Sequence, residues 1–155
     1  MKLSKETKYG LEGLILLAKR PVGTVMLLND IAVADDLPRF FLAKTFQKLT
    51  QHGVLRSFRG AVRGYALARP PKEIELQEIL EAIEGPDVLT RCIFWSLHCS
   101  DASPCPLHHR WKDMSKRVTE LLVGQTLEDL VRGGASQRRA TSRATRRQPS
   151  RGRRR

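Results

Sequence analysis

The sequence predicts a mainly α-helical fold with one small two-stranded sheet, and three observations support this. Apolar residues recur at helical spacing along most of the chain. One short segment alternates like a hairpin, and Gly or Pro follows the helical segments. The chain has 155 residues, of which 41% are hydrophobic, as is typical of globular proteins. We therefore exclude a fully disordered chain and most multi-domain enzymes.

The N-terminal segment has the pattern of three helices. We expect the first over residues 5–20 and a short second one over residues 28–34. The third begins at Pro38, which suits a first helical turn, and ends before Gly53, which suits a left-handed cap. A short helix, a tight break and a longer basic helix predict a helix-turn-helix.

The third helix has two contrasting faces. Its apolar side consists of Phe41, Leu42, Thr45, Phe46 and Leu49. The other side bears no acid, whereas a merely solvated face usually mixes both signs, and this favours insertion into the DNA major groove. The residues expected to face base edges are Arg39, Phe40, Ala43 and Gln47, with Lys44 and Lys48 on the phosphates.

A basic hairpin follows the third helix. We expect strands at Val54–Phe58 and Gly64–Ala68, joined by a turn that carries Arg59 and Arg63. A purely structural hairpin needs no arginine at its tip, whereas arginine suits phosphates and a narrow minor groove. A helix-turn-helix followed by such a hairpin is the order of a winged helix.

The second half predicts a short helix, a loop and a long helix. Leu76 to Ile83 form an acidic-faced helix that ends at Gly85, and residues 89–109 lack any period. The long helix starts near Leu107, and a small one follows over residues 126–131. Its apolar stripe comprises Trp111, Met114, Val118, Leu121 and Leu122. This stripe is either core within the chain or a homodimer seam, and half-sites related by a twofold axis favour the seam.

The loop carries all three cysteines, Cys92, Cys99 and Cys105, with His108 two positions beyond the last. Thiolates and imidazole are ligands for zinc and for iron-sulfur clusters. Buried free cysteines fit poorly beside the polar residues of this loop, and a thiol redox pair is a further alternative. Spacing alone does not separate zinc from a cluster.

Charge is distributed unevenly along the chain, whose formal net charge is +12. Residues 1–71 carry 12 basic and 5 acidic residues, whereas residues 72–132 carry 7 basic and 11 acidic residues. Residues 133–155 carry 9 arginines and no acid, so we expect a disordered tail that either adds phosphate contacts or has no specific role. The basic N-terminal half is the expected site for a polyanion.

Several function classes lack their motifs in this sequence. We find no phosphate loop, no paired-carboxylate motif and no nucleophile elbow, so we expect neither an enzyme nor a small-molecule substrate. The longest apolar run of the opening segment, Leu14–Ala18, is far too short to span a membrane. No signal-peptide cleavage site follows it, and we therefore expect a cytoplasmic protein without membrane contact.

Over roughly residues 1–132 the chain resembles the IscR/NsrR superfamily of winged-helix transcriptional regulators. Tyr9 matches an aromatic position near the family's start, and three cysteines followed by a histidine resemble its cluster loop. The wing signature Arg-Gly-x-x-Gly-Gly-Tyr-x-Leu is matched by Arg59, Gly60, Gly64, Tyr65 and Leu67. The resemblance implies a homodimeric regulator, expected to be a repressor, whose iron-sulfur cluster controls affinity for double-stranded operator DNA in response to iron, redox state or nitric oxide.

The chain departs from this family at three places. Arg63 replaces the first glycine of the wing pair, and six residues separate the first two cysteines where the cluster-assembly regulator has five. Lys8 stands where the nitric-oxide-sensing branch has an aspartate ligand. His108 is therefore the expected fourth ligand, ahead of His98, His109 and Glu6. A [2Fe-2S] cluster is preferred to a [4Fe-4S] cluster, with zinc as the alternative.

Together these expectations divide the chain into three parts. Residues 1–71 form a winged helix-turn-helix DNA-binding domain, and residues 72–132 form the cluster-binding loop and the dimerisation helices, the long C-terminal one among them. Residues 133–155 form the Arg-rich tail.

Overall fold

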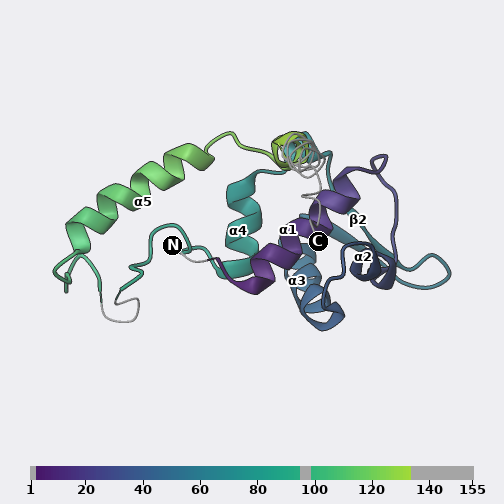
Figure 1. Ribbon diagram of the computed structural model, residues 1–155, viewed down its shortest axis with the longest axis horizontal. Helices are drawn as coiled ribbons and strands as arrows, with labels where there is room; N and C mark the ends of the chain where they lie inside the picture. The colour runs from purple at the N-terminus through teal and green to yellow at the C-terminus, as the bar shows by residue number, and fades with distance from the viewer. Residues whose placement is uncertain (1–2, 95–98, 134–155) are drawn as a thin grey trace, which may run out of the picture.

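The computed structural model describes residues 3–94 and 99–133 (Figure 1). Its elements are α1 (Lys5–Ala18), α2 (Leu28–Ala34), α3 (Arg39–Gln51), β1 (Leu55–Phe58), β2 (Gly64–Leu67), the 3-10 helix η1 (Pro71–Glu73), α4 (Leu76–Glu84) and α5 (His108–Leu122). Residues 127–133 are also helical. This confirms the mainly α fold with a two-stranded wing. The expected disordered tail lies, from residue 134 on, outside the described residues.

Local sequence explains where the helices begin and end. The Ser4 hydroxyl accepts a hydrogen bond of 3.2 Å from the Thr7 amide and so caps α1. Pro38 precedes the first turn of α3, and Gly53, with φ of +73°, follows its end. These boundaries lie within two residues of those that the sequence predicts.

The core lies where α1 and α4 cross α3. Leu42, Phe46 and Leu49 of α3 are fully buried, as the periodicity predicts. Gly13 of α1 permits the close approach, because a Cβ atom there would lie 2.8 Å from the Phe46 ring. The sequence placed Phe41 on the same face, but it is 40% exposed and lies at the rim of the core.

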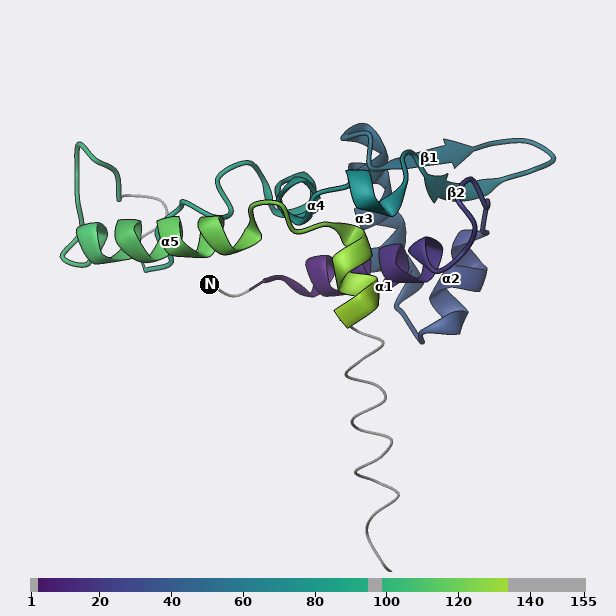
Figure 2. The same cartoon turned by 90° about the horizontal axis from the view of Figure 1, so that it is seen from above.

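The wing is an antiparallel hairpin in which Leu55 pairs with Leu67 and Phe58 with Gly64. Two backbone hydrogen bonds of 2.9 Å, between Met26 and Tyr65, attach it to the segment before α2. The hairpin and α5 lie at opposite ends of the molecule (Figure 2). The wing tip therefore projects away from α5.

The apolar stripe of α5 serves two purposes. Val118 and Leu122 pack against a small cluster formed by Leu80, Val88 and Leu89. Met114 and Leu121 of the same helix remain 53% and 75% exposed. Part of the stripe is thus core within the chain, and part is open. Among the described residues, no helix is both long and apolar enough to cross a membrane.

Candidate nucleic-acid interface and metal centre

A groove of about 930 Å³ lies between α2, the outer face of α3 and the wing. Seven of the eight predicted DNA-binding residues line it, namely Arg39, Phe40, Ala43, Lys44, Gln47, Arg59 and Arg63. No acidic side chain is among the described residues that line this groove. The surface is basic, with an apolar strip on α3, which suits a duplex groove and its phosphates.

Lys48, the eighth predicted residue, points elsewhere. Its ammonium donates to Glu6 Oε2 at 2.9 Å and to the Ile83 carbonyl at 2.8 Å. Lys44 donates to Glu6 Oε1 at 3.0 Å while it lines the groove. The hydrogen bonds from Lys48 and Lys44 hold the pKa of Glu6 below its usual range. Glu6 thus ties the first turn of α1 to α3, an ion pair that sequence patterns did not predict.

A second carboxylate, Glu84 at the end of α4, holds the start of α1. It accepts hydrogen bonds from the Ser4 amide at 2.8 Å and from the Thr7 hydroxyl. Partial burial raises its pKa, but the hydrogen bonds from Ser4 and Thr7 outweigh this and lower it overall. Its other oxygen lies 3.7 Å from the guanidinium of Arg91, the residue before Cys92. A chain of contacts therefore runs from the cysteine loop to α1.

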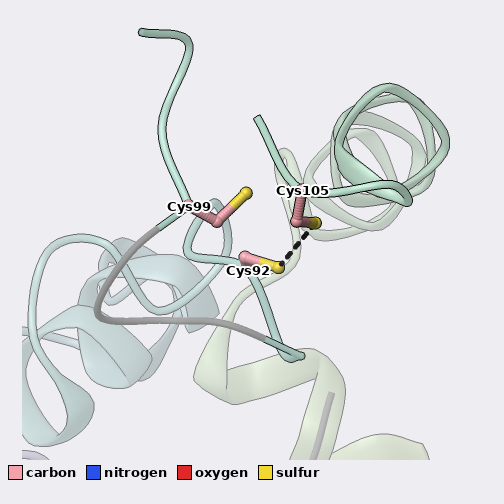
Figure 3. Close-up of side chains that lie close together, drawn as sticks. All are labelled: Cys92, Cys99 and Cys105. Carbon is pink, nitrogen blue, oxygen red and sulfur yellow. Dashed lines mark hydrogen bonds between the residues drawn. The ribbon is translucent and has the colours of Figure 1, made fainter. Parts of the chain in front are cut away.

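The three predicted cysteine ligands converge (Figure 3). Their sulfur atoms lie within 4.8 Å of one another, and Cys92 and Cys105 are 3.9 Å apart. No disulfide joins these three cysteines. Cys92 is buried, whereas Cys99 and Cys105 are half-buried. The loop thus presents three soft donors to one point, as a metal site needs.

The imidazole ring of His108 approaches this triad with its Nδ1 atom. Its Nδ1 lies 3.1 Å from Cys99 Sγ, and its Nε2 lies 2.8 Å from Asp101 Oδ1. Lys112 donates to both oxygens of Asp101, at 2.9 and 3.0 Å. A metal-binding histidine commonly donates its second N–H to a carboxylate, which fixes the ring. Sequence reasoning missed Asp101, because nothing in the loop's spacing distinguishes it.

The other candidate fourth ligands lie less favourably. His109 is exposed, and its ring centre lies 5.4 Å from that of His108. Both carboxylate oxygens of Glu6 are held by lysines. His98 lies outside the described residues. His108 therefore has the position of a fourth donor among the described candidates.

The donor set fits a bound metal or cluster. Partial burial and the neighbouring thiols of Cys99 and Cys92 raise the pKa of the Cys105 thiol. Three thiolates this close repel one another, and a bound cation offsets that repulsion. A pocket of about 260 Å³ adjoins the triad and is lined by Cys92, Cys99 and His108.

The fold and the basic groove define a winged-helix DNA-binding protein, a transcriptional regulator rather than an enzyme. Residues 3–133 match the Rrf2 family, described as an iron-dependent transcriptional regulator, and the chain belongs to that family.

Similar proteins agree with this identification. The chain is 28% identical over 132 residues to the HTH-type transcriptional regulator IscR of Xenorhabdus nematophila, covering 85% of this chain and 80% of that protein. CymR, the global cysteine regulator of B. subtilis, has a TM-score of 0.67 at 29% identity, covering 84% of this chain and 96% of CymR. T. potens IscR has a TM-score of 0.63 at 28% identity, and the match covers 86% of this chain and 88% of T. potens IscR.

Proposed function

We propose that this protein is a homodimeric repressor whose affinity for double-stranded operator DNA is controlled by an iron-sulfur cluster. The observation that carries the proposal is the convergence of Cys92, Cys99 and Cys105 within 4.8 Å, with His108 beside them. These residues would hold the cluster through three thiolates and the Nδ1 atom of His108. The description of the family as iron-dependent supports iron over other metals. When bound, the cluster would supply a redox-active or nitric-oxide-reactive centre.

The chain's own contacts suggest how the loop reaches α3. Arg91 lies next to Cys92, and its backbone carbonyl accepts a hydrogen bond of 2.9 Å from the Trp111 indole. Its guanidinium faces the Glu84 carboxylate. Glu84 holds Ser4 and Thr7 at the start of α1. If the cysteine loop moved when the metal site was filled or emptied, Arg91 would shift. The contacts that Glu84 makes with α1 would then weaken or strengthen.

The start of α1 in turn bears on α3. Glu6, in the first turn of α1, binds Lys44 and Lys48 of α3. A shift of α1 would therefore change the orientation of α3 and the availability of Lys44 for phosphate. Such a change redistributes the protein between DNA-competent and DNA-incompetent states.

The dimer is proposed from the open part of α5. Met114 and Leu121 are exposed apolar residues on a helix whose neighbours Val118 and Leu122 already pack inward. A second copy that covered this strip would bury it, and a twofold dimer would present two α3 helices to related half-sites.

A second candidate, a zinc-stabilised winged-helix protein without sensing, fits the same donor set and one of its distances equally well. A tetrahedral zinc with bonds of about 2.3 Å to sulfur has sulfur–sulfur edges of about 3.8 Å. The distance between the Cys92 and Cys105 sulfurs is 3.9 Å. Zinc would then serve only to hold the loop closed.

The two candidates separate by composition and spectrum. Protein purified without oxygen should contain iron and sulfide and be brown or reddish, and Cys92→Ala, Cys99→Ala or Cys105→Ala should each bleach the visible absorption. His108→Ala should make the cluster labile or shift its spectrum, with His109→Ala as the matched control. Nitric oxide or oxygen should then change the affinity for operator DNA. A colourless protein with one zinc per chain would refute cluster sensing and support the zinc candidate.

A further inference from the structure

The outer face of α3 carries an exposed aromatic side chain in a groove whose charged lining residues are all basic. Phe40 is 76% exposed and lies on the face of α3 that lines the groove proposed for DNA. Exposing a phenyl ring to water costs free energy unless a partner covers it. A partner of Phe40 must also accept the positive charges of Arg39, Lys44 and Arg59 around it. Duplex DNA meets both requirements.

The Phe40 ring has aromatic support from behind. Its centre lies 6.0 Å from that of Phe41 in an edge-to-face arrangement at 80°. Phe41 in turn lies 6.1 Å from Tyr9 of α1. Phe41 thus contacts an aromatic ring on each side at the rim of the core. The Phe41 ring contacts the Phe40 ring on one side and leaves most of it open to a partner.

Ala43 extends the apolar surface by one helical turn. It lies three residues after Phe40 on the same face and lines the same groove. Neither side chain has a hydrogen-bonding group, so neither reads base donors or acceptors. The one apolar group on a base edge in the major groove is the thymine methyl, which phenylalanine and alanine both suit.

We propose that Phe40, with Ala43 beside it, selects operators by contacting thymine methyl groups in the major groove. This inference rests on the proposed DNA-binding function and adds the chemical group that is read. Arg39 and Gln47 would supply the polar base contacts on either side. Specificity at the Phe40 position would then come from a methyl group and its apolar fit.

The test replaces thymine by deoxyuridine, which removes the methyl group and keeps the pairing edge. Duplexes of about 30 base pairs, long enough to span two half-sites, are first selected by the full-length protein from a random library. Each thymine of a selected duplex is then replaced in turn. At one thymine per half-site or more, the substitution should lower the affinity of the unaltered protein about fourfold, as burial of one methyl group predicts.

The Phe40→Ala variant should bind the thymine and uracil duplexes equally at that position, because an alanine side chain is too short to reach the methyl group that the phenyl ring contacts. Phe40 is largely exposed, so this variant should keep its unfolding midpoint. Val33→Ala is the matched control, since Val33 is 73% exposed on α2 and does not line the groove. It should keep the full methyl dependence.

Four results would overturn the inference, and they point to three different explanations. If no thymine position responds to removal of its methyl, or if Phe40→Ala responds as strongly as the unaltered protein, Phe40 does not read methyl groups although DNA binding stands. If Phe40→Ala changes the sedimentation of the DNA-free protein, the ring covers a protein contact instead. If the library yields no preferred duplex, the proposed function fails as well.

Discussion

Gly64, the first residue of β2, gives the sharpest stability prediction. Its φ of +145° is a conformation that other residues rarely adopt, and a Cβ atom there would lie 2.3 Å from the Met26 carbonyl oxygen. Because that atom belongs to the backbone, no rotamer change relieves the clash. Gly64→Ala must push the hairpin away from Met26.

The expected destabilisation follows from two contributions. Adopting the unfavourable backbone conformation with a side chain costs about 1–3 kcal/mol. Separation from Met26 breaks the two hydrogen bonds to Tyr65, each 2.9 Å long. They contribute together about 1–3 kcal/mol. Gly64→Ala should therefore lower the free energy of unfolding by about 2–6 kcal/mol.

Gly60→Ala at the wing tip is the matched control. Gly60 also has a positive φ, of +97°, but nothing lies within 4 Å of a Cβ atom there. This variant should suffer only the conformational cost of about 1–3 kcal/mol. Urea unfolding of the two variants measures the difference. Equal destabilisation in both would show that the Met26 contact does not hold the wing, and the reasoning would be wrong.

Four further outcomes are expected. Asp101→Asn should weaken metal binding about 10- to 100-fold in a chelator competition while Asp113→Asn does not, because a metal-binding histidine depends on the carboxylate that orients it. The pKa of Glu84 is lower in the folded state than in the unfolded chain, so the stability it contributes is present above about pH 4.3 and is lost as pH falls through its folded pKa. Glu84→Gln should accordingly flatten the acid limb of a pH–stability curve, and an unchanged limb would contradict this origin. Leu121→Asp should yield monomers in analytical ultracentrifugation, and a persistent dimer would mean that α5 is not the seam. Deletion of residues 133–155 should weaken binding to operator and to scrambled DNA by similar factors, and it should reduce the slope of log K against log salt by up to about 0.9 for each phosphate that the tail neutralises. Loss of discrimination at an unchanged slope would instead make the tail a reader of sequence.

The elements of the DNA-binding half could be predicted because their signals are local. Helical periodicity identified Leu42, Phe46 and Leu49 as core, and Pro38 and Gly53 marked the ends of α3. Such signals depend on neighbours within a few residues, where the geometry of a helix is fixed.

Contacts between distant segments could not be predicted in this way. Glu6 and its partner Lys48 are 42 positions apart, and only the crossing of α1 over α3 brings them together. Lys48 therefore turned inward although its position on the helix pointed to DNA. The cysteines could be named from their side chains, but the aspartate that orients His108 is one of several polar residues in an aperiodic loop.

Under the proposed function, the contacts that Glu84 makes with Arg91 and with Ser4 would have a consequence for metal binding as well as for DNA binding. Coupling between two binding sites is reciprocal, so under the proposed function the factor by which the metal would change DNA affinity is also the factor by which DNA would change metal affinity. Protein bound to an operator and protein free in solution would then release the metal at different chelator concentrations. The number of occupied operators would itself help to set how much of the regulator is loaded.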